Sequence, residues 1–115
     1  MKDFKRNICV YKDFFWDFYY SQTLEVQKKI DWVIGLITVL QIVPQKYLKC
    51  LSGTDGLYEI RIQVGNNIYR VFCFFDEGNL VILLSGFQKK TQKTSRKEIQ
   101  KAEQLRRDYY GSKSR

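Results

Sequence analysis

Histidine is absent from the 115 residues of this sequence, which removes the side chain that most often transfers protons near neutral pH. The three cysteines, Cys9, Cys50 and Cys73, are widely spaced and form no C-x-x-C pair that could begin a zinc site. No apolar run reaches the roughly 18 residues that a membrane span requires. We therefore expect reduced, partly buried cysteines, no metal or other cofactor, and no membrane association.

The first residues, MKDFKRN, lack the apolar core of a secretion signal, so the sequence favours a cytoplasmic protein. Hydrophobic residues make up 44% of the chain and aromatic residues 16%, which excludes a disordered chain. This composition and length fit one domain with its own core. We expect the domain to cover residues 1–110, and residues 111–115 to form a frayed tail.

The net charge of +8 is concentrated near the end of the chain. Residues 89–115 contain ten Lys or Arg against three Asp or Glu, whereas residues 1–88 contain ten against nine. A local excess of positive charge favours a nucleic acid or an acidic protein as partner. A solvated basic tail is the simpler explanation for the charge of residues 101–115.

The first part of the chain predicts a short strand and a helix. Residues 4–10 have the alternation of a short strand, and Asp13 can cap a helix over the aromatic block of residues 14–20. These aromatic side chains can fill the core or stack on nucleobases. Their helical spacing favours the core.

A longer helix is expected from Ser21 or Thr23 to about Val43, where the following Pro44 ends it. Its wide apolar stripe predicts that the helix is largely buried or is covered by a partner. Gly35 within it predicts a close contact between the helix and a sheet. The sequence after it, up to Gly56, contains turn residues and is expected to be a loop.

Three strands are then expected to form an antiparallel meander, at residues 57–64, 67–75 and 80–84. The Gly65-Asn66 pair suits a two-residue hairpin turn because glycine tolerates a positive φ. After the third strand, Gly86 lets a backbone or a ligand come close.

The predicted hairpin places Arg61 opposite Arg70, and a shift of one residue still leaves both on one face of the sheet. Two like charges opposite each other cost about 0.2–1 kcal/mol, so their charge needs compensation. The sequence leaves two explanations open: an anion bound between the arginines, or ion pairing with Glu59 on the same face. Because Lys89 and Lys90 follow the third strand, we expect a cluster of four cations that binds an anion.

The last helix is expected to begin at Thr94 or Ser95, since Ser95-Arg96-Lys97-Glu98 matches a capping box. The whole order predicts an α+β domain: a short strand, two helices, a three-stranded antiparallel meander and a basic helix, with the helices on one face of the sheet.

Phosphoryl transfer is the reaction in which positioned positive charges can supply most of the catalysis. If RNA bound across the arginine face, Arg61 and Arg70 could hold the scissile phosphate while the RNA's own 2′-hydroxyl attacks, without a metal. Lys89 or Lys90, with a pKa lowered by neighbouring cations, could exchange protons. The plainer alternative is that both lysines only clamp phosphate.

Three motifs in this part of the chain resemble those of the HigB-type toxins in the RelE/ParE superfamily. They are Leu-Tyr-Glu-Ile-Arg at residues 57–61, Tyr-Arg-Val at residues 69–71, and Gly-Phe-Gln-Lys-Lys-Thr-Gln-Lys-Thr at residues 86–94. The close match covers about residues 56–102, and the two preceding helices agree in order and length. The resemblance implies a RelE/ParE-like fold.

The resemblance also implies a toxin that cleaves messenger RNA on the ribosome and is neutralised by a helix-turn-helix, HigA-like antitoxin. On this basis we assign Arg61, Arg70, Lys89 and Lys90 to catalysis, and Phe87, Lys93, Arg96 and Lys97 to RNA binding. The chain departs from its relatives in having no histidine and no tyrosine between Lys90 and Tyr109. The group that activates the 2′-hydroxyl is left open among Lys90, Lys89 and the pair Tyr109/Tyr110.

Three other functions fit the same sequence. A ParE-type toxin would inhibit gyrase without catalysis, and the fold alone cannot separate it from a nuclease. A nucleic-acid-binding module would only dock phosphates, with an affinity that falls with salt. A prophage remnant would have lost its activity.

Overall fold

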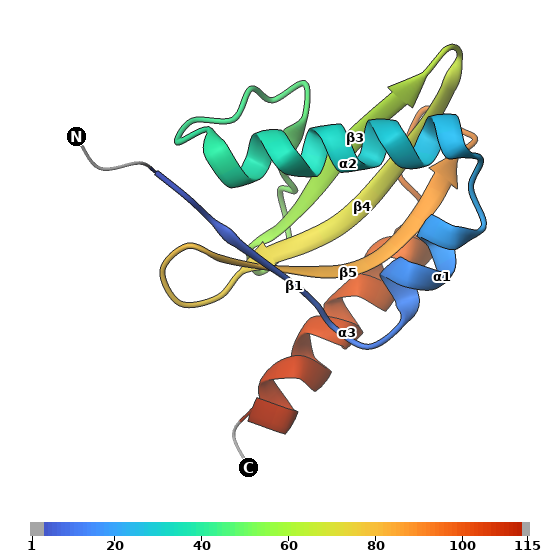
Figure 1. The fold of residues 1–115 in the computed structure, drawn as a ribbon. Coiled ribbons are helices and arrows are strands. Elements are labelled where there is room, and N and C mark those ends of the chain that lie inside the picture. Colours follow the sequence, from blue (N-terminus) through green and yellow to red (C-terminus); the bar gives the residue numbers. More distant parts are fainter. Residues whose placement is uncertain (1–3, 114–115) are drawn as a thin grey trace.

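In the computed structural model, which describes residues 4–113, a five-stranded sheet has helices on both of its faces (Figure 1). The elements in chain order are β1 (Asn7–Val10), α1 (Phe14–Tyr20), α2 (Leu24–Val39), β2 (Leu48–Cys50), β3 (Leu57–Val64), β4 (Asn67–Phe75), β5 (Leu80–Lys89) and α3 (Arg96–Lys113). The predicted α+β class, with its antiparallel meander, is confirmed. Within the described part, no helix combines the length and apolar character needed to cross a membrane.

The strand order in the sheet is β1-β5-β4-β3-β2. The meander β3-β4-β5 is antiparallel, and β1 pairs with β5 in the parallel direction. The segment expected to be a loop before Gly56 contains β2, which pairs Leu48 with Ile60. A strand of three residues is too short to show a periodic pattern in the sequence, which explains the wrong prediction.

Strand β5 continues to Lys89 instead of ending at residue 84. Its second half pairs with the start of β4, where Val71 lies opposite Gly86 and Ile68 opposite Lys89. The pairing of β4 with β5 is irregular between Val71 and Cys73 of β4, and this irregularity separates the second half of β5 from its first half. The extension carries Phe87 and Lys89 into the sheet and fixes their side chains on defined faces.

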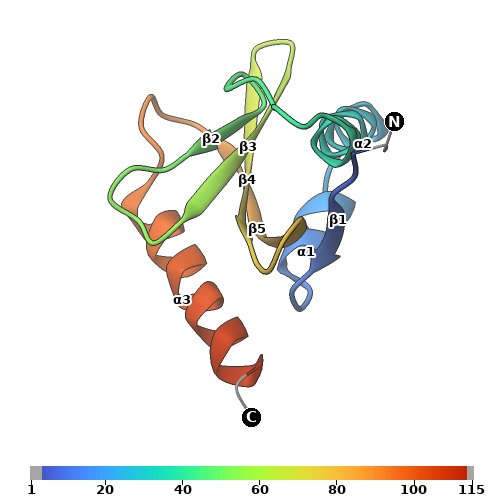
Figure 2. The same cartoon turned by 90° about the vertical axis from the view of Figure 1, so that its left-hand side faces the viewer.

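The helices cover both faces of the sheet, so the expectation that they share one face was wrong. In Figure 2, α1 and α2 lie on one side of the sheet and α3 on the other. Val71 and Cys73 of β4 belong to the core under α1 and α2, whereas Phe72 and Phe74 belong to the core under α3. Because β4 is apolar on both faces, the sheet needs cover on both.

Helix α2 buries one stripe, Val26, Ile30, Val33 and Ile37, as its periodicity predicts. It begins after Thr23, whose hydroxyl accepts a hydrogen bond from the backbone N–H of Val26.

The helix ends at Val39, well before the proline that was expected to end it. The guanidinium of Arg6 donates hydrogen bonds to the carbonyls of Ile37, Leu40 and Gln41, at 2.8, 2.6 and 2.9 Å. A positive group on these last carbonyls satisfies acceptors that the helix itself leaves free. This contact between distant segments has no signature in the sequence of the helix.

The aromatic block of α1 is only partly in the core. Phe15 and Phe18 are buried, whereas Trp16 and Tyr20 are 40% and 70% exposed. Asp13, at the start of the helix, makes no side-chain capping bond. Two of the three cysteines, Cys9 and Cys50, are exposed rather than partly buried, and Cys73 is buried.

Helix α3 starts as predicted, with the hydroxyl of Ser95 accepting from the N–H of Lys97 at 3.2 Å. It continues through Lys113, so residues 111–113 are helical rather than frayed, and residues 114–115 lie outside the described residues. The last turn is held by Asp76, which accepts hydrogen bonds from Tyr109 and Lys113. These bonds lower the pKa of Asp76 to about 2.

Two glycines differ from their predicted roles. A Cβ at Gly86 would lie within 2.9 Å of three atoms of the buried Phe18 ring, so what comes close at Gly86 is α1. At Gly35 a Cβ would meet nothing within 4 Å, so the expected tight contact between α2 and the sheet is absent there.

We predict that Gly86→Ala lowers the free energy of unfolding by about 1–3 kcal/mol, because the new methyl displaces the Phe18 ring from a packed core. The matched change Gly35→Ala should instead raise it by about 0.5–1 kcal/mol, since alanine is the better helix former. Urea unfolding of the two variants measures both effects. Equal effects of the two substitutions would contradict this account of Gly86.

Candidate active site

The hairpin between β3 and β4 has the predicted register, with Val64 opposite Asn67 and Arg61 opposite Arg70. Gly65 adopts φ 60° at the first turn position. The backbone N–H of Arg61 donates to the carbonyl of Tyr47 on the other side of β3, at 2.8 Å. The arginines are therefore a pair without mutual backbone hydrogen bonds, the type in which facing side chains lie closest.

Strand β5 adds two more side chains to this face. Arg70 lies opposite Phe87, and two residues further along β5 Lys89 lies opposite Ile68. Because side chains alternate along a strand, four side chains point to the same face of the sheet: Arg61, Arg70, Phe87 and Lys89. Helix α3 covers this face too, but at the end away from the arginines. The predicted sharing of one face by the two arginines and Lys89 is thus seen in the structure.

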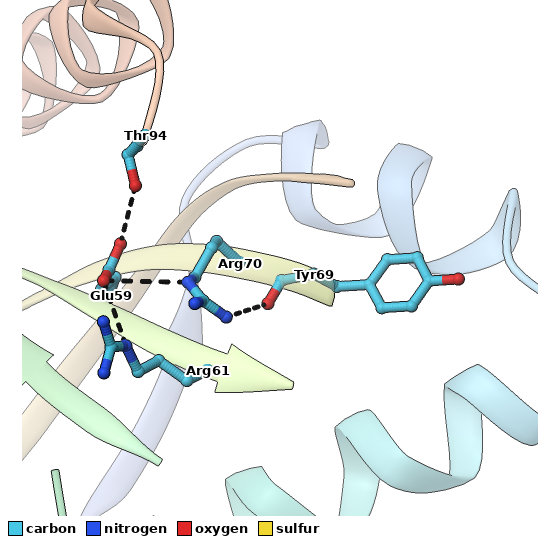
Figure 3. Close-up of polar contacts among 5 residues, drawn as sticks. All are labelled: Glu59, Arg61, Tyr69, Arg70 and Thr94. Atoms are coloured by element: carbon cyan, nitrogen blue, oxygen red, sulfur yellow. Dashed lines mark hydrogen bonds and ion pairs between the residues drawn. The ribbon is translucent and has the colours of Figure 1, made fainter. Parts of the chain in front are cut away.

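The carboxylate of Glu59 lies between the two arginines, in the close-up of Figure 3. Its Oε1 atom is 3.2 Å from Nε of Arg61 and 3.7 Å from Nε of Arg70. Its Oε2 atom accepts a hydrogen bond of 3.3 Å from the hydroxyl of Thr94, in the segment between β5 and α3. Glu59 is 3% exposed, so this is a buried ion pair, and the Glu59 explanation of the arginine pair is seen directly.

Glu59 uses only the Nε side of each arginine. Nη1 of Arg70 donates to the carbonyl of Tyr69 at 3.1 Å. Among the described residues, no hydrogen bond engages Nη2 of Arg70 or either Nη atom of Arg61. These N–H groups form the fork that binds phosphate oxygens well. One carboxylate neutralises one charge, so the two arginines and Lys89 together keep a positive excess.

The pKa of Lys89 is lowered, first by its burial and then by the positive charge of Arg70, with smaller contributions from Arg61 and Lys49. Glu59 acts in the opposite direction. Burial likewise lowers the pKa of Arg70, again opposed by Glu59. Of the residues assigned to catalysis, Lys89 is therefore the lysine that the fold places inside the electrostatic field of the arginine pair.

A cavity of about 530 Å³ opens beside the arginines. Its lining also contains Lys29 of α2 and Lys46 of the segment before β2, two cations that the motifs did not indicate. Neither lysine lies near the arginines in the sequence. The packing of α2 on the sheet brings Lys29 to the cavity, and the pairing of the segment around β2 with β3 brings Lys46 there. The lining residues are Lys29, Lys46, Tyr47, Arg61, Ile62, Gln63, Gly65 and Arg70.

The other predicted residues lie around this cluster. Lys90 and Lys93 line a smaller cavity of about 220 Å³ together with Phe87 and Lys89. The Phe87 ring packs on Phe72, with 5.4 Å between the ring centroids, so part of it belongs to the core. Arg96 lines a separate hollow between α3 and the turn before β3, and Lys97 is exposed in the first turn of α3.

The tyrosines Tyr109 and Tyr110 do not reach the cluster. They bind Asp76, just beyond the far end of β4, six residues or about 20 Å along the strand direction from Arg70. The hydrogen bond to Asp76 also raises the pKa of Tyr109 to about 12, which keeps its proton in place. Their inclusion among the candidates for activating the 2′-hydroxyl was therefore wrong.

The residues brought together can bind phosphate and stabilise negative charge that develops on it. A buried carboxylate orients the two guanidinium groups, and a lysine with a lowered pKa stands beside them. Over residues 4–113, no three His, Cys, Asp or Glu side chains gather where a metal ion could be held. The chemistry available to this cluster is electrostatic stabilisation and proton transfer.

The α+β fold with its five-stranded sheet is compatible with the RelE-like class of folds. A family model matches residues 20–107, about three-quarters of the chain, and the chain therefore belongs to the phage-derived Gp49-like family (DUF891). This family is associated with toxins of RelE and HigB type. No curated protein matches the sequence.

We predict opposite shifts in the pKa of Lys89 from two substitutions. Arg70→Gln should raise it, because a neighbouring positive charge is removed, and Glu59→Gln should lower it further, because the favourable negative charge is lost. Titration of the lysine side-chain resonances by NMR measures both shifts, with Lys28→Gln as a control that leaves Lys89 unchanged. Shifts in the same direction would contradict the described electrostatics.

Proposed function

We propose that this protein is the toxin of a type II toxin–antitoxin pair and that it cleaves messenger RNA on the ribosome, in the cytoplasm. The observation that carries the proposal is the pair Arg61 and Arg70, oriented by Glu59, with three of their four Nη atoms free of hydrogen bonds within the described residues, beside an open cavity. Membership of a phage-derived family linked to such toxins supports it.

In the proposed reaction, Arg61 and Arg70 donate hydrogen bonds from their Nη groups to the non-bridging oxygens of the scissile phosphate. The 2′-oxygen of the preceding ribose forms a bond to phosphorus while its proton passes to a water molecule, and the bond from phosphorus to the 5′-oxygen breaks. The products are a 2′,3′-cyclic phosphate and a 5′-hydroxyl. The arginines stabilise the charge that grows on the phosphate in the transition state.

Lys89 is the proposed proton donor to the departing 5′-oxygen. A lowered pKa makes its ammonium a stronger acid than an ordinary lysine, which favours proton donation. Lys90 and Lys93, exposed beside Phe87, are proposed to clamp neighbouring phosphates. Arg96 and Lys97, at the start of α3, extend the positive surface for the same RNA.

The proposed partner is a helix-turn-helix, HigA-like antitoxin. Helix α2 supports a protein partner on its outer side, where Leu24, Trp32 and Val39 are 73%, 50% and 58% exposed. Large apolar side chains exposed along one helix leave surface that a partner could bury. Cover by a partner was one of the two roles expected for this helix.

We predict that induced expression in bacteria arrests growth and produces new ends within translated codons of messenger RNA. Arg70→Ala and Lys89→Ala should each reduce the cleavage at these sites by about 10²–10³-fold, because each removes a charge aimed at the reacting phosphate. The matched control is Lys5→Ala, an exposed cation before β1 at the opposite edge of the sheet. Mapping of RNA ends in each strain measures the effect.

Two results would contradict the proposal. Growth arrest with intact messages and damaged DNA would indicate a gyrase inhibitor of ParE type. An absence of arrest and of cleavage, with the protein folded and present, would leave a phosphate-binding module or an inactive remnant.

A further inference from the structure

The cavity beside the arginine pair has a second positive wall. Arg61 and Arg70 line the cavity from the face of the sheet that α3 covers, whereas Lys29 belongs to α2 on the opposite face and Lys46 to the segment before β2, at the edge of the sheet. The lining contains four cations and no acidic residue. In Figure 1, α2 crosses the sheet close to the hairpin, which explains how residues so far apart in sequence share one cavity.

The two lysines are held by an aromatic pair. The rings of Trp32 and Tyr47 meet edge to face, with 5.4 Å between their centroids. The Nζ atom of Lys29 lies 4.8 Å from the centre of the Trp32 ring, and that of Lys46 lies 5.5 Å from the centre of the Tyr47 ring. Contacts of this length between an ammonium and an aromatic ring are attractive, so they favour a defined position for each lysine.

This wall is fixed to the arginine wall through the backbone, since the carbonyl of Tyr47 accepts the hydrogen bond from the N–H of Arg61. The charge of the two walls differs in one respect. Glu59 compensates part of the arginine charge, whereas within residues 4–113 neither Lys29 nor Lys46 forms an ion pair. Two uncompensated cations therefore face a cavity whose volume lies in the range of about 300–1,000 Å³ that accommodates ligands larger than one phosphate.

We propose that Lys29 and Lys46 form a second phosphate subsite. It binds the RNA phosphate that neighbours the one held by Arg61 and Arg70, so that the strand is fixed on both sides of one nucleotide. This inference rests on the proposed function, because it takes the ligand of the arginine pair to be single-stranded RNA. The two lysines act by binding and positioning, without contact to the reacting atoms.

Binding of a short single-stranded RNA with 2′-O-methyl groups tests the subsite, because this RNA has no free 2′-hydroxyl and is not cleaved. The dissociation constant is measured over a range of salt concentrations for the wild type, Lys29→Gln, Lys46→Gln and Arg70→Gln. Lys28→Gln is the matched control: Lys28 is exposed, adjacent to Lys29 on the same helix, and outside the cavity lining.

Each phosphate contact to a single strand adds about 0.7 to the slope of the logarithm of affinity against the logarithm of salt concentration. Lys29→Gln and Lys46→Gln should therefore each weaken binding and reduce the slope by about 0.7, and Lys28→Gln should change neither.

If both variants behave like Lys28→Gln while Arg70→Gln weakens binding, the subsite is wrong and the arginine site stands. If the wild type does not bind this RNA, the subsite is wrong, and if it binds without dependence on Arg70, both proposals fail. If the predicted slopes appear but free 2′-hydroxyl RNA on the ribosome is not cut, the subsite holds and the nuclease is wrong.

Discussion

The carboxylate of Glu59 between Arg61 and Arg70 is the interaction on which the rest of the site depends. Two guanidinium groups facing each other across adjacent strands repel, and this repulsion is strongest where burial keeps water away. Glu59 offsets it by lying near both Nε atoms, and its second oxygen accepts from Thr94. One buried group thereby ties β3, β4 and the segment before α3 together. Removing it would leave two buried or half-buried cations facing each other without compensation.

The ion pair and the anion site are two consequences of the same geometry. Because Glu59 lies at the Nε sides, both Nη atoms of Arg61 and Nη2 of Arg70 are left without a hydrogen bond among the described residues, beside a cavity that both arginines line. Groups held by a second layer of contacts bind a transition state better than mobile ones, since little reorganisation is needed during the reaction. Helix α3 covers this face of the sheet only in part. It packs on Phe72 and Phe74 and leaves the end with the arginines open.

Much of this arrangement could be predicted from short-range patterns. Alternation along β3 and β4, together with the glycine in the turn, was sufficient for the register that pairs Arg61 with Arg70. The features that were missed depend on long-range contacts. Strand β2 exists because it pairs with β3, and α2 ends where Arg6 binds its carbonyls. Lys29 reaches the cavity through the packing of α2 on the sheet, and Lys46 through the pairing of the segment around β2 with β3, so no local motif could indicate them.

The chemistry of the RNA ends tests the central claim most directly. Purified protein is incubated with ribosomes that are translating a defined message, and the new ends are identified for the wild type and Arg70→Gln. The account predicts a 2′,3′-cyclic phosphate on the upstream fragment and a 5′-hydroxyl on the downstream fragment, both lost in Arg70→Gln. An intact message, or ends with a 3′-hydroxyl and a 5′-phosphate, would contradict attack by the 2′-hydroxyl on a phosphate held by the arginine pair.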